Sequence, residues 1–375
     1  MLVPPPPIWR AGETLGEQLA HAGVSRRDLL KFAGRMATLI AMGPLLPGQT
    51  AAIAETIADK LASVKKPNAV WLQLQECTGC LESTLRAGHT SIEELVLNMV
   101  SLNYCELVMA ASGNAANAAL DATNREPHIL VINGSVPTAN AGYCTIGGKS
   151  TETILREAAA NATAILAVGS CAFDGCVQAA APNPTGAVGV RDILTGREVV
   201  NVSGCPPIAD VITATIVYVL TYGRTPPVDE LGRPLFAYGA RIHDNCPRRA
   251  HYDAGQFVTS FSDQASREGH CLAHMGCKGP DTFSPCPVIK WNGEISFPIQ
   301  AGHPCLGCTE PHWFDRNTPF YHALPNIPGM GVESTANKVG AVALAAVGVG
   351  IAAHGVATLV RRHLRSDDDT PPSSD

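Results

Sequence analysis

The sequence is poor in charged and in aromatic residues. Charged residues make up 16% and aromatic residues 5% of its 375 positions, and the formal net charge is −6 with histidine neutral. Because there is no excess of basic residues, nothing indicates a nucleic-acid-binding surface. Alanine and glycine are abundant instead, which suits α/β packing. The length indicates two domains with additional segments.

Cysteine is the residue type that stands out. Ten of the 13 cysteines, with one histidine, fall into three groups. The groups are Cys77, Cys80, Cys171 and Cys205; then His243, Cys246, Cys271 and Cys277; then Cys286, Cys305 and Cys308. Thiolate sulfur is the preferred ligand of iron in iron–sulfur clusters. Three such groups predict a series of redox centres that conducts electrons, because a single redox step needs only one.

Two other uses of cysteine compete with this interpretation. A disulfide framework is typical of short secreted chains, whereas this chain is long and has ample apolar residues for a core. Structural zinc also uses C-x-x-C pairs, and two such pairs alone would make zinc a serious alternative. Groups of four, four and three ligands favour iron–sulfur clusters over zinc, and zinc over disulfides. His243 alone would be an ordinary surface histidine, but its spacing to Cys246 favours a ligand.

The N-terminal residues 1–54 are expected to form a twin-arginine export signal. The run Ser25–Lys31 contains the pair Arg26 and Arg27 and precedes an apolar stretch at residues 32–46. A chance arginine pair before a helix is the alternative, but the surrounding residues and the small residues at 51–54 argue against it. Cleavage is expected near Ala54. This route exports folded proteins, so the signal and the predicted clusters support each other.

The C-terminal residues 339–360 are expected to form one transmembrane helix. The segment has 22 residues and a single strongly polar side chain, His354. At about 1.5 Å per residue it spans a hydrocarbon core of about 30 Å. Basic residues follow in the tail at 361–375, so the positive-inside rule places the tail in the cytoplasm and the bulk of the protein outside. A buried core helix is the alternative, and the basic cluster argues against it.

Short apolar runs alternate with helical segments from about Pro67, which predicts an α/β fold with a doubly wound, mostly parallel sheet. The predicted strands are Val70–Leu74, Leu107–Ala110, Ile129–Ile132, Ile165–Val168 and Val199–Val202. The predicted helices are Ser91–Leu102, Asn114–Asn124, Ser150–Asn161 and Ile208–Thr221. The first ligand group follows three of these strands, at the sheet edge where open α/β sheets bind ligands.

The pattern changes after about Pro226, where clean periodicity gives way to dense Gly, Pro, Cys and His. We expect residues 67–225 to form the α/β domain and residues 226–325 an irregular domain. That second domain would be organised by its clusters, since metal binding can supply folding free energy.

Seven ordered motifs between Pro67 and His322 resemble those of nickel–iron hydrogenase small subunits, and both ends resemble the membrane-bound uptake branch. The motifs are Glu76–Cys80, Gly169–Ala172, Val177–Pro184, Gly204–Pro207, Ile242–Cys246, Gly276–Pro280 and Gly302–Cys308. The resemblance implies a flavodoxin-like domain that holds a proximal [4Fe–4S] cluster on the first group. It implies a distal [4Fe–4S] cluster on the second group and a medial [3Fe–4S] cluster on the third. Pro298 stands where a fourth ligand of the medial cluster would otherwise be expected.

The resemblance also implies a reaction and partners. H2 would be oxidised at a nickel–iron site in a large subunit, so this chain has no catalytic residue of its own and carries electrons to a membrane cytochrome b and quinone. His354 is a candidate haem ligand, although packing against a neighbouring helix is the favoured interpretation. Two rival functions are a stand-alone electron carrier and a respiratory quinone-reductase subunit, which would hold one cluster.

One branch of this family adds two cysteines to the proximal group and gains tolerance to oxygen. Here the two positions are Gly79 and Cys176, so one of the two cysteines is present. We therefore expect an ordinary [4Fe–4S] proximal cluster. Cys105, Cys144 and Cys176 are otherwise interpreted as small buried residues without a ligand role.

Overall fold

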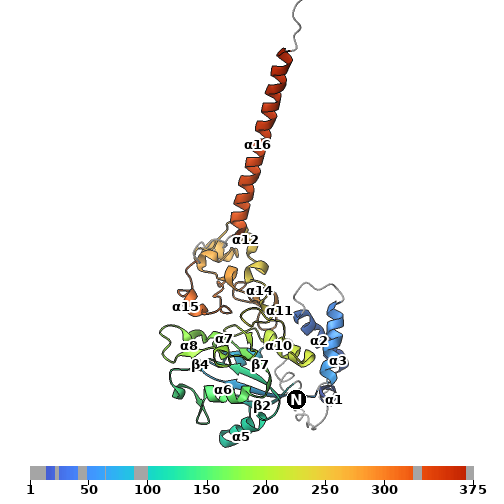
Figure 1. The fold of residues 1–375 in the computed structure, drawn as a ribbon, viewed down its shortest axis with the longest axis vertical. Coiled ribbons are helices and arrows are strands. Elements are labelled where there is room, and N and C mark those ends of the chain that lie inside the picture. The colour runs from blue at the N-terminus through green and yellow to red at the C-terminus, as the bar shows by residue number, and fades with distance from the viewer. Residues whose placement is uncertain are drawn as a thin grey trace, which may run out of the picture. The chain divides into compact units, whose positions relative to one another are not determined.

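The computed structural model describes residues 14–21, 25–40, 49–63, 65–87, 100–323 and 332–368 (Figure 1). The chain separates into two compact units. The first contains Met1–Tyr252 and Gln256–Ala323, and the second contains Asp253–Gly255 and Leu324–Asp375.

A five-stranded parallel sheet forms the centre of the first unit. Its strands lie in the order β2-β1-β3-β7-β9. Their bounds are β1 (Asn68–Gln73), β2 (Ser101–Cys105), β3 (His128–Asn133), β7 (Ala162–Val168) and β9 (Val200–Val202). The pairing between β1 and β3 is continuous, from Val70 opposite Leu130 to Gln73 opposite Asn133. This result confirms the parallel α/β fold that the alternating pattern predicts.

Apolar side chains cover both faces of the sheet, because a parallel sheet must bury both. Ala69 and Trp71 of β1 pack on one face with α10 (Ala209–Tyr222). Val70 and Leu72 pack on the other with α5 (Gly113–Thr123) and α6 (Thr151–Ala159). Ser150 caps α6, since its hydroxyl accepts the amide of Thr153 at 3.3 Å. The ligand-bearing loops are thus held on a sheet buried on both sides.

Four of the five predicted strands are confirmed, and one is wrong. The run Leu107–Ala110 lies in a turn after the strand, and the actual strand is β2 at residues 101–105. β2 is an edge strand that is only half-buried, so it lacks a continuous apolar run. The predicted helix Ser91–Leu102 is not confirmed, because Ser101 and Leu102 are strand residues and residues 91–99 lie outside the described residues. The other three predicted helices are confirmed as α5, α6 and α10.

Shorter elements connect this framework. The helices are α4 (Gly79–Leu85), η2 (Ala141–Tyr143), α7 (Ser170–Asp174), α8 (Cys176–Ala179) and α9 (Val190–Ile193). Two small antiparallel pairs join β4 (Val136–Pro137) to β8 (Ala187–Val188) and β5 (Thr145–Ile146) to β6 (Lys149–Ser150).

Within the expected export signal at residues 1–54, nearly all of the described residues are helical. α1 (Leu15–His21), α2 (Arg26–Ile40) and α3 (Gln49–Ser63) belong to the same apolar cluster as α10, with Met36 and Ile57 fully buried. Ser25 caps α2 through its hydroxyl, which accepts the amide of Asp28 at 3.2 Å. Arg26 and Arg27 lie exposed in the first turn of α2.

Residues 226–323 contain only short helices of three to five residues. They are α11 (Leu235–Tyr238), η3 (Ile242–Asn245), α12 (Arg249–Asp253), α13 (Gln264–Arg267), η4 (Ala273–Met275), η5 (Gly279–Asp281), α14 (Cys286–Ile289) and α15 (Trp313–Asn317). The buried Arg233 connects the beginning and the end of this part of the chain. It forms hydrogen-bonded ion pairs with Asp229 at 2.8 Å and with Glu310 at 3.0 Å. The irregular texture predicted for this part is confirmed.

The second unit consists mainly of α16 (Val332–Asp368). Within it, Val342–Arg361 has the length and composition of a membrane span, with a mean hydropathy of 1.9, and the residues of this stretch are exposed. This stretch overlaps the predicted span at residues 339–360 and contains His354.

Candidate metal centres

The first ligand group lies beyond the carboxyl ends of three strands. Cys77 and Cys80 follow β1, Cys171 lies in α7 after β7, and Cys205 follows β9. Burial raises the pKa of the Cys80 thiol well above its usual value, and the electrostatic effects of Glu76, Cys205 and Cys77 raise it further. The sheet thus brings together the cysteines that sequence spacing assigns to the first group.

Gly169 allows this convergence. Its backbone has φ 97°, a conformation that favours glycine, and a Cβ at this position would lie 2.3 Å from the sulfur of Cys80. A side chain here would therefore displace the Cys80 sulfur. The close approach explains why glycine stands at position 169, between β7 and α7.

Cys176, which sequence analysis interprets as a buried residue without a ligand role, lies among the cysteines of the first group. Its thiol hydrogen-bonds those of Cys171 and Cys205, and the Cys171 bond is the main reason that its pKa rises to about 12. The indole Nε1 of Trp313 donates to the Cys176 sulfur at 3.1 Å. Gly79, the second of the two positions where a further cysteine was considered, lies beside the sulfur of Cys77.

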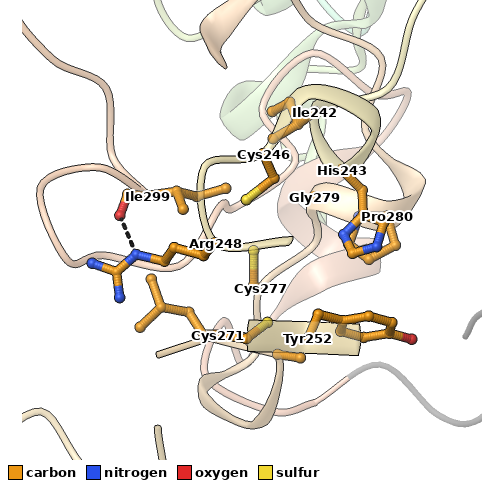
Figure 2. Close-up of a pocket in the computed structure, with 12 residues that line it drawn as sticks. Ile242, His243, Cys246, Arg248, Tyr252, Cys271, Cys277, Gly279, Pro280 and Ile299 are labelled. Atoms are coloured by element: carbon orange, nitrogen blue, oxygen red, sulfur yellow. Dashed lines mark hydrogen bonds between the residues drawn. The ribbon is translucent and has the colours of Figure 1, made fainter. Parts of the chain in front are cut away.

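The second group lines a small cavity of about 20 Å³. Figure 2 shows the sulfurs of Cys246, Cys271 and Cys277 facing the same space, with the ring of His243 to one side. The His243 ring packs edge-on against Tyr252, with centroids 4.7 Å apart. On the opposite side, Arg248 donates from Nε to the Ile299 carbonyl at 3.0 Å (Figure 2). All four predicted ligands therefore line one site.

The third group lines a cavity of about 160 Å³. Cys286, Cys305 and Cys308 are on its wall, and Pro298 is on the wall with them. The Cys286 sulfur accepts from the Ser284 hydroxyl at 3.2 Å and from the indole of Trp291 at 3.5 Å. The amide of Gly307 donates to the Cys305 sulfur at 3.3 Å. These donors favour thiolate over thiol at a ligand position.

Hydrogen bonds connect the three groups in one order. At the first junction, Cys205 of the first group lines the same cavity as the three cysteines of the third group. The amide of Cys305 in the third group donates to the sulfur of Cys277 in the second, at 3.4 Å. Ser170 reinforces the first junction, because its hydroxyl donates to the Cys308 carbonyl at 2.6 Å. The third group thus lies between the other two.

The donor set fits iron–sulfur clusters. All 13 cysteines are free thiols, so the disulfide alternative is not realised. Burial raises the pKa of Cys271 to about 11 and that of Cys308 to about 12. Buried thiols of this kind ionise when a metal takes the place of the proton. Within the described part of the chain, no three His, Cys, Asp or Glu side chains converge as tightly as a single ion requires. The sulfurs of the second and third groups instead stand on the walls of cavities, which suits a polynuclear cluster.

Four residues around these sites were missed by sequence reasoning. Trp313, Trp291 and Ser284 donate to cysteine sulfurs. Lys278, which directly follows Cys277, is 3% exposed and donates to three backbone carbonyls. Lys278 stands inside a quoted motif, but sequence alone gives no sign that it is buried. The tryptophans and Ser284 carry no sequence signal beyond their nearness to ligands.

Two family models match the chain. The model described as the C-terminal part of NiFe/NiFeSe hydrogenase small subunits matches residues 238–321. The model described as the 20 kDa subunit of NADH ubiquinone oxidoreductase matches residues 77–219. The first match contains the second and third ligand groups, and the second match contains the first group. The sheet part is thus shared with a respiratory family, and the hydrogenase model covers the part after it.

Curated relatives match over nearly the whole chain. The uptake hydrogenase small subunit of Azotobacter vinelandii is 43% identical, over 96% of this chain and 99% of that protein. The hydrogenase-1 small chain of Escherichia coli K12 is 42% identical, over 96% of each. Among solved structures, the Ni-Fe-Se hydrogenase of Desulfomicrobium baculatum is 34% identical with a TM-score of 0.65, and the match covers 69% of this chain and 100% of that one.

Proposed function

This chain belongs to the small subunits of nickel–iron hydrogenases, and on that premise we propose that its three ligand groups hold three iron–sulfur clusters that carry electrons out of the enzyme. The active site of this class of oxidoreductase is in the large subunit, with which the small subunit pairs. The observation that carries the proposal is the pair of junctions Cys205–Cys308 and Cys305–Cys277, which connect the groups in series.

The assignment follows the ligand counts. The first group, next to the sheet, is assigned a proximal [4Fe–4S] cluster and the second a distal [4Fe–4S] cluster with His243 as one ligand. The third is assigned a medial [3Fe–4S] cluster, supported by three cysteines and Pro298 around one cavity. Such clusters supply one-electron redox centres.

The residues of this chain have three tasks in such a conductor. The thiols and His243 hold the metal, and hydrogen bonds such as those from Ser284 and Trp291 stabilise the negative charge on sulfur. Burial of Cys286 and Cys305 excludes water from the third site. The contacts Cys205–Cys308 and Cys305–Cys277 shorten the distance that an electron crosses between neighbouring ligand groups.

We also propose a domain organisation on this basis. Residues 67–225 form a doubly wound, flavodoxin-like domain, supported by the order β2-β1-β3-β7-β9, which matches the flavodoxin order of first to fifth strand. Residues 226–325 form the cluster-binding domain. Residues 1–54, 339–360 and 361–375 are the export signal, the anchor and the cytoplasmic tail.

The proposal further includes a place in the membrane and an acceptor. The stretch Val342–Arg361 anchors the protein, with its bulk on the outer face of the bacterial inner membrane. The exposed pair Arg26 and Arg27 is read by the twin-arginine route. Electrons then pass to a membrane cytochrome b and to quinone. His354 packs against a neighbouring helix in this proposal.

Co-purification tests the function against its rivals. If the chain is a hydrogenase subunit, extraction from membranes recovers a large subunit with nickel and iron, and the complex reduces artificial dyes with H2. A lone chain that carries clusters but has no H2-dependent activity would instead be a stand-alone carrier. A single cluster in the chain would favour a quinone-reductase subunit.

A further inference from the structure

Lys278 is a buried cation at the junction of the second and third ligand groups. It is 3% exposed and directly follows Cys277 of the second group. Its backbone amide donates to the carbonyl of Cys305, a ligand of the third group, at 2.8 Å. The amide of Cys305 donates in turn to the Cys277 sulfur at 3.4 Å. Lys278 is thereby fixed to both groups through the main chain.

The hydrogen bonds of the side chain fit an ammonium group. Its Nζ donates to the carbonyls of Gly276 at 2.6 Å, Phe320 at 3.1 Å and His322 at 2.8 Å. Three acceptors require three N–H donors, which an ammonium has and a neutral amine lacks. In the described part of the chain, no carboxylate lies within ion-pair distance of Lys278, and nearby Asp281 pairs with Arg316 at 3.3 Å.

A buried charge of this kind needs compensation. Removing an ammonium from water costs several kcal/mol in a protein, and the three carbonyl dipoles offset part of that cost. The negative groups with which the ammonium interacts are the sulfurs of Cys277 and Cys305, one from each ligand group. The arrangement is therefore that of one cation shared by two anionic sites.

We propose that Lys278 is the common counter-ion of the second and third clusters and raises the reduction potentials of both. This inference rests on the proposed function, since it concerns clusters held by these two groups. Reduction adds a negative charge to a cluster, and a fixed positive charge nearby stabilises the reduced form. Lys278 acts through the field at the clusters and is a positioning residue, not a ligand.

The test is a redox titration of the complete two-subunit complex, in which electron paramagnetic resonance monitors each cluster. Lys278→Met removes the charge, and Lys278→Gln removes it while keeping two donors for the carbonyls. In both variants, the reduction equilibria of the second and third clusters should shift at least tenfold toward the oxidised form. For a one-electron couple this is a fall in reduction potential of about 59 mV. The first cluster should not shift. Lys278→Arg, which keeps the charge, should stay near the wild-type values.

Lys290→Gln is the matched control, because Lys290 follows Cys286 by four residues but is not fully buried. It should leave all three potentials unchanged. Intact clusters with unshifted potentials in both neutral variants would overturn the proposal. Loss of iron from both neutral variants, with Lys278→Arg still loaded, would assign Lys278 a structural role and overturn it as well. Absence of cluster signals from the wild-type complex would instead overturn the proposed function itself.

Discussion

The backbone amide of Cys305 donates a hydrogen bond to the sulfur of Cys277, with the two atoms 3.4 Å apart. Cys305 belongs to the third ligand group and Cys277 to the second, although 28 positions separate them in the sequence. On the other side, Cys205 of the first group lines the cavity of the third group, and the hydroxyl of Ser170, next to Cys171, donates to the Cys308 carbonyl at 2.6 Å. The third group is therefore the middle one in space, which is the place that the medial assignment requires.

Pro298→Cys should convert the third centre from a three-iron to a four-iron cluster. Pro298 lines the same cavity as Cys286, Cys305 and Cys308, and proline has no side chain that binds iron. A cysteine there supplies a fourth thiolate, so the centre should titrate at a lower potential. Electron paramagnetic resonance of the oxidised complex checks this result. A wild-type complex without any three-iron signal would contradict the assignment.

Cys176 should affect stability more than redox behaviour. Cys176→Ala leaves the buried indole N–H of Trp313 without its acceptor, which should cost about 1–3 kcal/mol of unfolding free energy. Cys176→Ser retains an acceptor and is the matched control, measured by denaturant unfolding of the isolated complex. The proximal centre should show a single one-electron transition in both variants and in the wild type. Two transitions at accessible potentials in the wild type would mean that Cys176 takes part in a modified cluster.

Sequence reasoning recovered the parts of this molecule that depend on continuous apolar runs or on ligand chemistry. The buried strands β1, β3, β7 and β9 stand out as such runs, whereas the edge strand β2 does not, because Ser101 and Asn103 interrupt it. Leu107 and Val108, taken for a strand, are about half-exposed. The fold brings the members of each cysteine group together, and their roles as cluster ligands stay a prediction.

The remainder depends on contacts between distant segments. Lys278 resembles any surface lysine until the carbonyls of Phe320 and His322 are brought beside it. Trp313 reaches Cys176 across 137 positions, and no local pattern reports such a contact. The order of the three groups in space follows from two contacts, that of Cys205 with the cavity of the third group and that of Cys305 with Cys277, which ligand spacing alone cannot give.

Deleting the chain after Ser334 should release the complex from the membrane. The deletion removes Val342–Arg361, whose residues are exposed and apolar. Because the cluster sites lie in the other compact unit, the soluble complex should still reduce dyes with H2 but should no longer reduce quinone. The measurement is activity in membrane and soluble fractions with each acceptor. Full H2-to-quinone activity after truncation would count against the anchor.

Replacing both Arg26 and Arg27 with Lys should leave the complex in the cytoplasm. The two side chains are exposed at the start of α2, and the export receptor reads the arginine pair and not the charge alone. Arg35→Lys in the same helix is the control and should be exported normally. Cell fractionation of both variants gives the answer. Normal export of the double variant would point to another route.

The central claim is that this one chain holds three iron–sulfur centres in series. Quantifying iron, sulfide, nickel and zinc in the membrane-extracted complex, together with electron paramagnetic resonance before and after exposure to H2, tests it most directly. The account predicts iron and sulfide for two four-iron clusters and one three-iron cluster, all reduced by H2, with nickel confined to the large subunit. Zinc at these cysteines, or a single cluster that H2 reduces, would contradict it.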